Sequence, residues 1–156
     1  VWFAFGPMAI LAASVSQNLG MHPLIITAMP ITGISTLSIL LIGQLIDFQA
    51  DKESGKWGVA VRLGTHSTVY IYLTVQLVLM VNVVILSFML KGFSFLILIC
   101  LLPYLIILPK IIRNLLPHYD QPALLQKAAG MNVQLHLQFS VLLVIGILLF
   151  KLFGKA

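Results

Sequence analysis

Charged residues are scarce in this sequence. Only 8% of the 156 residues are Asp, Glu, Lys or Arg, 60% are hydrophobic, and the mean hydropathy is +1.09. In soluble domains about half of the residues are apolar. The composition therefore excludes an ordinary soluble domain and indicates a chain whose solvent is the lipid bilayer.

Cysteine is nearly absent as well. The single Cys100 lies inside an apolar run, so no disulfide framework can form within the chain and no Cys/His metal cluster is visible. The pI of about 9.6 would suggest nucleic acid as a partner of a soluble protein. No basic stripe interleaved with aromatic residues is present, however, which argues against nucleic-acid binding. The basic residues lie at the ends of apolar runs, as the positive-inside rule predicts.

Five apolar segments can be marked along the chain, and they predict an all-α integral membrane bundle of about five transmembrane helices. Runs of this length exclude barrel strands, which need about ten alternating residues. The first segment is shorter than the roughly 20 residues that span a bilayer, and the chain opens inside it without methionine. We therefore expect the C-terminal part of a longer protein. The segments are approximately 1–15, 23–46, 67–90, 93–108 and 133–153, with a tight turn predicted at Lys91-Gly92.

Two longer polar connections, 47–66 and 109–131, should lie on the same side of the membrane, because the spans alternate in direction. Together they hold six of the nine basic residues, which predicts that both are cytoplasmic. The second connection has apolar pairs at helical spacing, so we expect a short interfacial helix there, interrupted at Pro117.

A few polar residues fall inside the apolar segments. For Gln76, Asn132 and His136, hydrogen bonding between helices is the simpler interpretation and a catalytic role is the alternative. Tyr72 is expected to be an aromatic anchor at the membrane interface.

The acidic residues are concentrated in one short passage. Asp47, Asp51 and Glu53 are three of the four acids in the chain, and they directly follow the second apolar segment. If its helix continues, the i, i+4 spacing puts the Asp47 and Asp51 carboxylates on one face. Two like charges at this spacing repel unless a cation lies between them. Gly55 comes one turn later, where the missing side chain would leave room for a ligand.

Basic residues are interleaved with these acids. Two carboxylates combined with substrate phosphates are a common way to bind Mg²⁺, and Lys52, Lys56 and Arg62 could donate to a diphosphate beside the metal. The alternative is a solvated loop with i, i+4 salt bridges. Physical reasoning on the residues alone leaves both interpretations open.

The residues around the acids give further information about the function of this passage. The passage DFQADKESGKWGVAVRLG (47–64) resembles the second aspartate motif of the UbiA superfamily of intramembrane prenyltransferases, usually written DxxxDxxxGKxTLAVRLG. The motif follows a membrane span, as it does in that superfamily. FGPMAIL (5–11) is similar to the GPLAVLG signature of the branch that prenylates 1,4-dihydroxy-2-naphthoate. The resemblance covers essentially the whole chain, as the last five of nine helices, so that 1–156 would be the C-terminal part of one prenyltransferase domain.

This resemblance implies an Mg²⁺-dependent enzyme that transfers a polyprenyl group from its diphosphate to an aromatic acceptor, as in menaquinone-like quinone biosynthesis. Asp47 and Asp51 would be catalytic metal ligands, and Lys52, Lys56 and Arg62 would bind the diphosphate. Gln44 and Trp57 could contact substrate. The implied location is the cell (inner) membrane, with 47–66 facing the cytoplasm.

The chain departs from the superfamily pattern at several positions. The first aspartate motif, NDxxDxxxD, is not in the sequence, so the chain alone is expected to be inactive. Gly43-Gln44 stands where relatives often have Asn-Asn, Ile46 where they have Arg, and Gly58 where they have Thr. The alternative to an enzyme is a non-enzymatic helical membrane subunit, such as a carrier half or an assembly scaffold, which would leave the paired acids unexplained.

Overall fold

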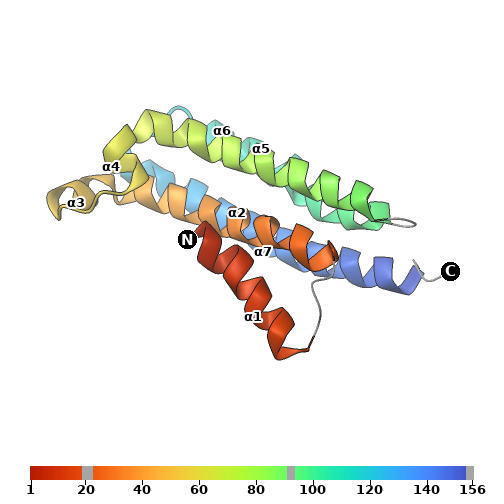
Figure 1. The fold of residues 1–156 in the computed structure, drawn as a ribbon. Helices are drawn as coiled ribbons and strands as arrows, with labels where there is room; N and C mark the ends of the chain where they lie inside the picture. The colour runs from red at the N-terminus through yellow and green to blue at the C-terminus, as the bar shows by residue number, and fades with distance from the viewer. Residues whose placement is uncertain (19–22, 91–93, 154–156) are drawn as a thin grey trace.

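The structure, a computed structural model, describes residues 1–18, 23–90 and 94–153, and all of its regular elements in these ranges are helices (Figure 1). The prediction of an all-α chain is therefore confirmed for the described residues. In chain order the elements are the π-helix η1 (Ala4–Met8), α1 (Ala9–Ser16), α2 (Pro23–Ile46), α3 (Phe48–Glu53), α4 (Val59–Leu63), α5 (Thr65–Met89), the 3-10 helix η2 (Ser94–Leu101), α6 (Leu102–Leu115) and α7 (Pro122–Phe153).

Four stretches of the described chain are long and apolar enough to cross a membrane, which makes the chain an integral membrane protein. They are Ile25–Ile46, Thr65–Met89, Ser94–Leu115 and Pro122–Phe153. The prediction of about five spans is too high by one on this criterion, because the first apolar helix, Ala4–Ser16, is shorter. The expected turn at Lys91-Gly92 lies outside the described residues.

The second polar connection does not contain the separate interfacial helix that the sequence suggested. The stretch from Pro109 to Leu115 belongs to α6, and the residues from Pro122 onward already belong to α7. Only residues 116–121 form a turn, so the predicted interruption at Pro117 is confirmed. The apolar residues at helical spacing in this connection belong instead to the ends of the two flanking helices.

A buried set of hydrogen bonds joins α5, α6 and α7 in the interior of the bundle. The Tyr72 hydroxyl donates to Asn132 Oδ1 at 2.9 Å, Gln76 Nε2 donates to the Tyr72 hydroxyl at 2.7 Å, and the Tyr104 hydroxyl lies 3.4 Å from Gln76 Oε1. All four side chains are buried. Tyr72 is thus not the interface anchor that was predicted, because its hydroxyl finds its partners inside the protein.

A second polar contact joins α2 to α7, where Ser35 Oγ lies 2.6 Å from His136 Nδ1. The interpretation of Gln76, Asn132 and His136 as interhelical hydrogen-bonding residues is confirmed by these contacts. Such bonds are needed in a bilayer because lipid offers polar groups no alternative partner.

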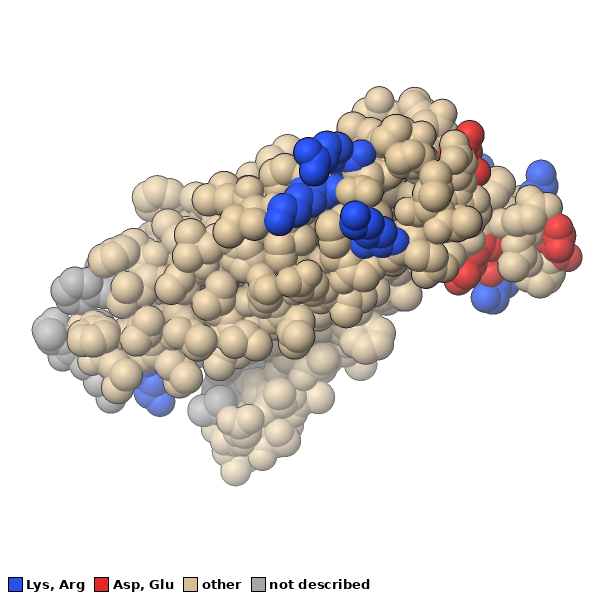
Figure 2. Space-filling view, turned by 180° about the vertical axis from the view of Figure 1, so that it is seen from behind, with Lys and Arg blue, Asp and Glu red and all other residues tan. Residues whose placement is uncertain are grey.

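The two polar connections meet at the same end of the bundle, as predicted. The His66 ring at the start of α5 lies edge-on to Tyr119 of the second connection, with 5.2 Å between ring centroids. A small cavity of about 70 Å³ between the connections is lined by Leu45, Phe48, Thr65, Tyr119, Asp120 and Pro122. Figure 2 shows the acidic side chains of the visible face gathered at this end, while most of the bundle surface is uncharged.

Glycine allows close contact between α7 and η2. A Cβ added at Gly146 would lie 2.9 Å from both Ile97 Cα and Leu96 O, which are backbone atoms and cannot rotate away. Gly130, on the same helix, would meet nothing within 4 Å. Both glycines lie in α7, but Gly146 is closely packed against η2 and Gly130 is not.

We predict that Gly146→Ala destabilises the bundle by about 1–3 kcal/mol, the usual cost of overpacking. Gly130→Ala should be neutral or stabilising by up to about 1 kcal/mol, because alanine favours the helix. Unfolding of the protein in mixed micelles with increasing SDS would measure both. Equal stability of the two variants would contradict the close α7–η2 packing.

Candidate functional site

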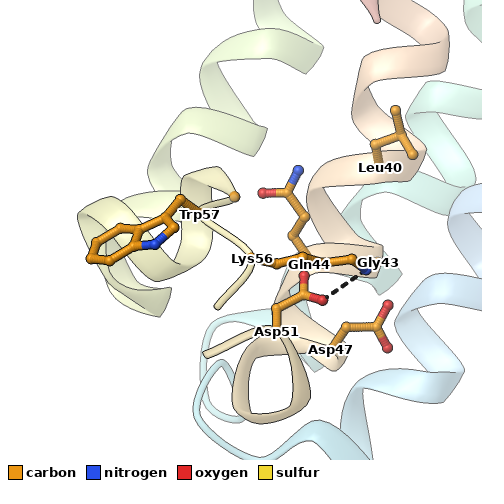
Figure 3. Close-up of a pocket in the computed structure, with 8 residues that line it drawn as sticks. Leu40, Gly43, Gln44, Asp47, Asp51, Lys56 and Trp57 are labelled. Carbon is orange, nitrogen blue, oxygen red and sulfur yellow. Dashed lines mark hydrogen bonds and ion pairs between the residues drawn. The ribbon is translucent and has the colours of Figure 1, made fainter. Parts of the chain in front are cut away.

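A cavity of about 350 Å³ lies at the end of α2, next to α3 and the segment that leads into α4 (Figure 3). Its lining combines apolar side chains with two carboxylates, an amine and an amide. The residues that line it are Leu40, Gly43, Gln44, Asp47, Asp51, Lys56, Trp57 and Gly58. Five of the seven site residues predicted from the sequence therefore lie together.

The backbone brings the two aspartates to this cavity by continuing the helix almost without interruption. α2 ends at Ile46, and Asp47 has φ −85° and ψ 4° before α3 begins. The helical hydrogen bonds nevertheless run through it: Asp47 N–H donates to Gly43 O at 2.9 Å, and Asp51 N–H donates to Asp47 O at 2.8 Å. The predicted i, i+4 arrangement therefore holds, with one irregular residue between two helices.

Gly55 ends α3 in a left-handed cap. Its φ is +73°, Lys56 N–H donates to Asp51 O at 2.8 Å, and Gly55 N–H donates to Lys52 O at 3.4 Å. These two bonds form a Schellman motif, in which the residue after the helix adopts a conformation that glycine tolerates best. A Cβ at Gly55 would meet nothing within 4 Å. The structure thus gives this glycine a conformational role, and the room for a ligand suggested by the sequence stays a prediction.

The cap turns Lys56 back toward α3, where its Nζ lies 3.0 Å from Asp51 Oδ1. The Asp51 side chain is only 12% exposed, whereas that of Lys56 is 73% exposed. Because water screens the exposed partner, the pair contributes at most about 1 kcal/mol to stability. Lys56 nevertheless offsets the charge of Asp51, the one acid that is largely removed from solvent.

The Asp47 carboxylate is exposed and has no hydrogen-bond or ion-pair partner among the described residues. In Figure 3 it lies beside the Asp51 carboxylate, on the side away from Trp57. The cavity therefore presents one carboxylate that is already paired with a lysine and one that is available to a cation.

Gln44 of α2 holds the start of α4 next to the cavity by hydrogen bonds. Its Oε1 accepts hydrogen bonds from the backbone N–H groups of Val59, at 2.6 Å, and Ala60, at 3.4 Å. These N–H groups open α4 and have no partner within it. The sequence named Gln44 only as a possible substrate contact. Its role as a cap could not be predicted, because the partners are 15 and 16 residues away and belong to a helix of five residues.

The other predicted site residues are placed differently. Lys52 in α3 and Arg62 in α4 are exposed and are not among the residues that line the cavity, so their assignment to the diphosphate stays a prediction. Trp57 lines the cavity but is 69% exposed, which places it at the rim. Glu53 is exposed and accepts a hydrogen bond from Gln49 Nε2 at 2.7 Å.

The donor set fits a hard cation such as Mg²⁺. Asp47 and the free oxygen of Asp51 are hard ligands, and Mg²⁺ is commonly held by one or two carboxylates completed by water and substrate phosphates. Within the described residues no group of three or more His, Cys, Asp or Glu side chains could hold a metal by itself. The remaining ligands would have to come from water and substrate.

The chain is 31% identical over 144 residues to 2-carboxy-1,4-naphthoquinone phytyltransferase of Synechocystis sp.. The aligned part covers 91% of this chain and 46% of the relative, so the chain spans about half the length of the protein it matches. No protein-family model matches the chain. No solved structure matches it either.

This relative is a member of the UbiA family, and the distant similarity agrees with the resemblance of the motif at 47–64 to that superfamily.

We predict that Gly55→Ala destabilises the folded protein by about 1–2 kcal/mol, the cost of a left-handed conformation for a residue with a Cβ. Gly55→Asn should cost less, because asparagine accepts this conformation more readily. Thermal unfolding of the detergent-solubilised variants would test the order. If both variants are as stable as the wild type, the cap does not form as described.

Proposed function

We propose that the protein transfers an isoprenoid group from a prenyl diphosphate to an aromatic acceptor, and that the cavity at the end of α2 binds the diphosphate. The observation that carries this proposal is the pairing of Asp47 and Asp51 in one cavity with Lys56, at the end of an apolar bundle. The similarity to a naphthoquinone phytyltransferase supports a bicyclic quinone-type acceptor and a long isoprenoid donor. The pathway would then be a menaquinone-like quinone biosynthesis, and the site would face the cytoplasm from the cell membrane.

In this proposal Asp47 and Asp51 would hold Mg²⁺, which, when bound, would add positive charge beside the phosphate oxygens. Lys56 would donate to the same oxygens and stabilise the negative charge that the leaving diphosphate acquires as the allylic C–O bond breaks. An aromatic carbon of the acceptor would form the new C–C bond and then lose its proton. The apolar side of the cavity, including Leu40, would exclude water from the cation.

We predict that Asp47→Asn or Asp51→Asn lowers prenyl transfer at least about 100-fold, because the amide keeps the size of the side chain but removes the charge that attracts the metal. The matched control is Glu53→Gln, which removes an exposed acid of α3 outside the cavity and should change activity little. Transfer of a radiolabelled prenyl group, with Mg²⁺ and with EDTA, would be measured on the protein as its gene encodes it. Full activity of all three variants would mean that the acidic passage is only a solvated loop and not the site of the reaction.

A further prediction separates phosphate binding from membrane orientation among the lysines. Lys56→Ala should weaken use of the prenyl diphosphate by about 1.5–3 kcal/mol, the usual contribution of a hydrogen bond to a charged group. Lys110→Ala removes an exposed lysine of α6 away from the cavity and should have little effect. Initial rates at varied diphosphate and saturating Mg²⁺ would compare them. Equal effects would mean that both charges serve only orientation in the membrane.

A further inference from the structure

The side-chain amide of Gln44 has a fixed orientation in the cavity. A backbone N–H can only donate, so the atom that meets the N–H groups of Val59 and Ala60 must be the amide oxygen. The assignment of O and N, which the shape of an amide leaves open, is settled here by its partners. The amide nitrogen consequently has to point elsewhere, and it can only donate.

Gly58 allows the oxygen to reach these partners. A Cβ at position 58 would lie 2.8 Å from Gln44 Oε1 and 3.1 Å from Gln44 Cδ. Any other residue would push the amide away from the start of α4. Gln44 and Gly58 thus form a matched pair that holds the amide in place across the cavity.

The amide nitrogen has no hydrogen-bond partner among the described residues, although Gln44 lines the cavity and is only partly exposed. Figure 3 shows it turned away from Asp47 and Asp51, toward the side on which Leu40 lies. The cavity is therefore divided. Its acidic part, with Lys56, suits a metal and a diphosphate, whereas the part beside Leu40 is uncharged and offers the oriented NH₂ group of Gln44.

We propose that Gln44 determines acceptor specificity, with its Nε2 donating a hydrogen bond to a carbonyl-type oxygen of the aromatic acceptor while Leu40 contacts the ring. This inference rests on the proposed function and names the part of the site that the acceptor occupies. A neutral donor next to an apolar surface favours an uncharged ring that carries an oxygen over a bare hydrocarbon. The hydrocarbon would leave the N–H group without a hydrogen-bond acceptor, which costs binding free energy. Gln44 also positions the loop through Oε1, so the two roles must be separated experimentally.

The variant Gln44→Glu separates the anchoring of the loop by Oε1 from hydrogen-bond donation by Nε2. A glutamate oxygen can still accept from Val59 and Ala60, so the loop keeps its anchor, but the donor that faces Leu40 is replaced by an oxygen. Gln44→Met removes both the anchor and the donor. Gln49→Glu is the matched control, since it introduces the same charge on the exposed surface of α3 outside the cavity.

The experiment measures binding of 1,4-naphthoquinone and of naphthalene to the detergent-solubilised protein by isothermal titration calorimetry. We expect the wild type and Gln49→Glu to prefer the quinone. Gln44→Glu should lose this preference by about 10-fold or more while its thermal unfolding stays that of the wild type. An unchanged preference in Gln44→Glu, or an equal loss of affinity for both probes, would overturn the inference.

A parallel measurement distinguishes this inference from the proposed function. Asp47→Asn should weaken binding of Mn²⁺ with inorganic pyrophosphate, followed by electron paramagnetic resonance, and leave quinone binding unchanged. If Asp47→Asn behaves so and Gln44→Glu keeps the quinone preference, only the role of Gln44 is wrong. If Asp47→Asn binds Mn²⁺ and pyrophosphate like the wild type, the proposed function itself fails.

Discussion

A bilayer offers no hydrogen bonds to a protein, and this constraint shapes every element of the chain. Backbone groups are satisfied within helices, and several polar side chains inside the spans form hydrogen bonds to other helices. Tyr72, Gln76 and Asn132 do this between α5 and α7, and Ser35 and His136 do it between α2 and α7. Charged groups are too costly to bury inside the spans in this way, so they gather at the end of the bundle, where water begins. The candidate site lies at that boundary.

The geometry of the site follows from two backbone caps. The glycine cap at Gly55 turns the chain so that Lys56 returns to Asp51, and the Gln44 oxygen holds the start of α4 against α2. Neither cap contributes much energy by itself, since one such bond is worth about 1 kcal/mol. Their effect is positional: a short, charged segment is fixed between two long helices, and its side chains surround one cavity.

Under the proposed function, one small cavity would serve two chemically different substrates. Carboxylates and a lysine attract a metal and phosphate oxygens, whereas Leu40 and the amide nitrogen of Gln44 suit an uncharged ring that carries an oxygen. Because Leu40 and Gln44 of α2 and Asp47 directly after it lie at successive turns, the polar and apolar parts follow each other along the chain. A donor and an acceptor bound there would meet at the border between the two parts.

Composition and spacing alone determined the all-helical membrane architecture, the shared end of the two polar connections and the joint placement of Asp47 and Asp51. These depend on local properties, namely apolar run length and helical periodicity. The sequence did not predict the continuation of α6 through Pro109, the burial of Tyr72, or the cap from Gln44 to Val59 and Ala60. Each of these depends on a partner that is distant in the chain, or on the choice between two local structures of similar free energy. Only the packing of the helices brings those partners together, so only the tertiary structure could decide them.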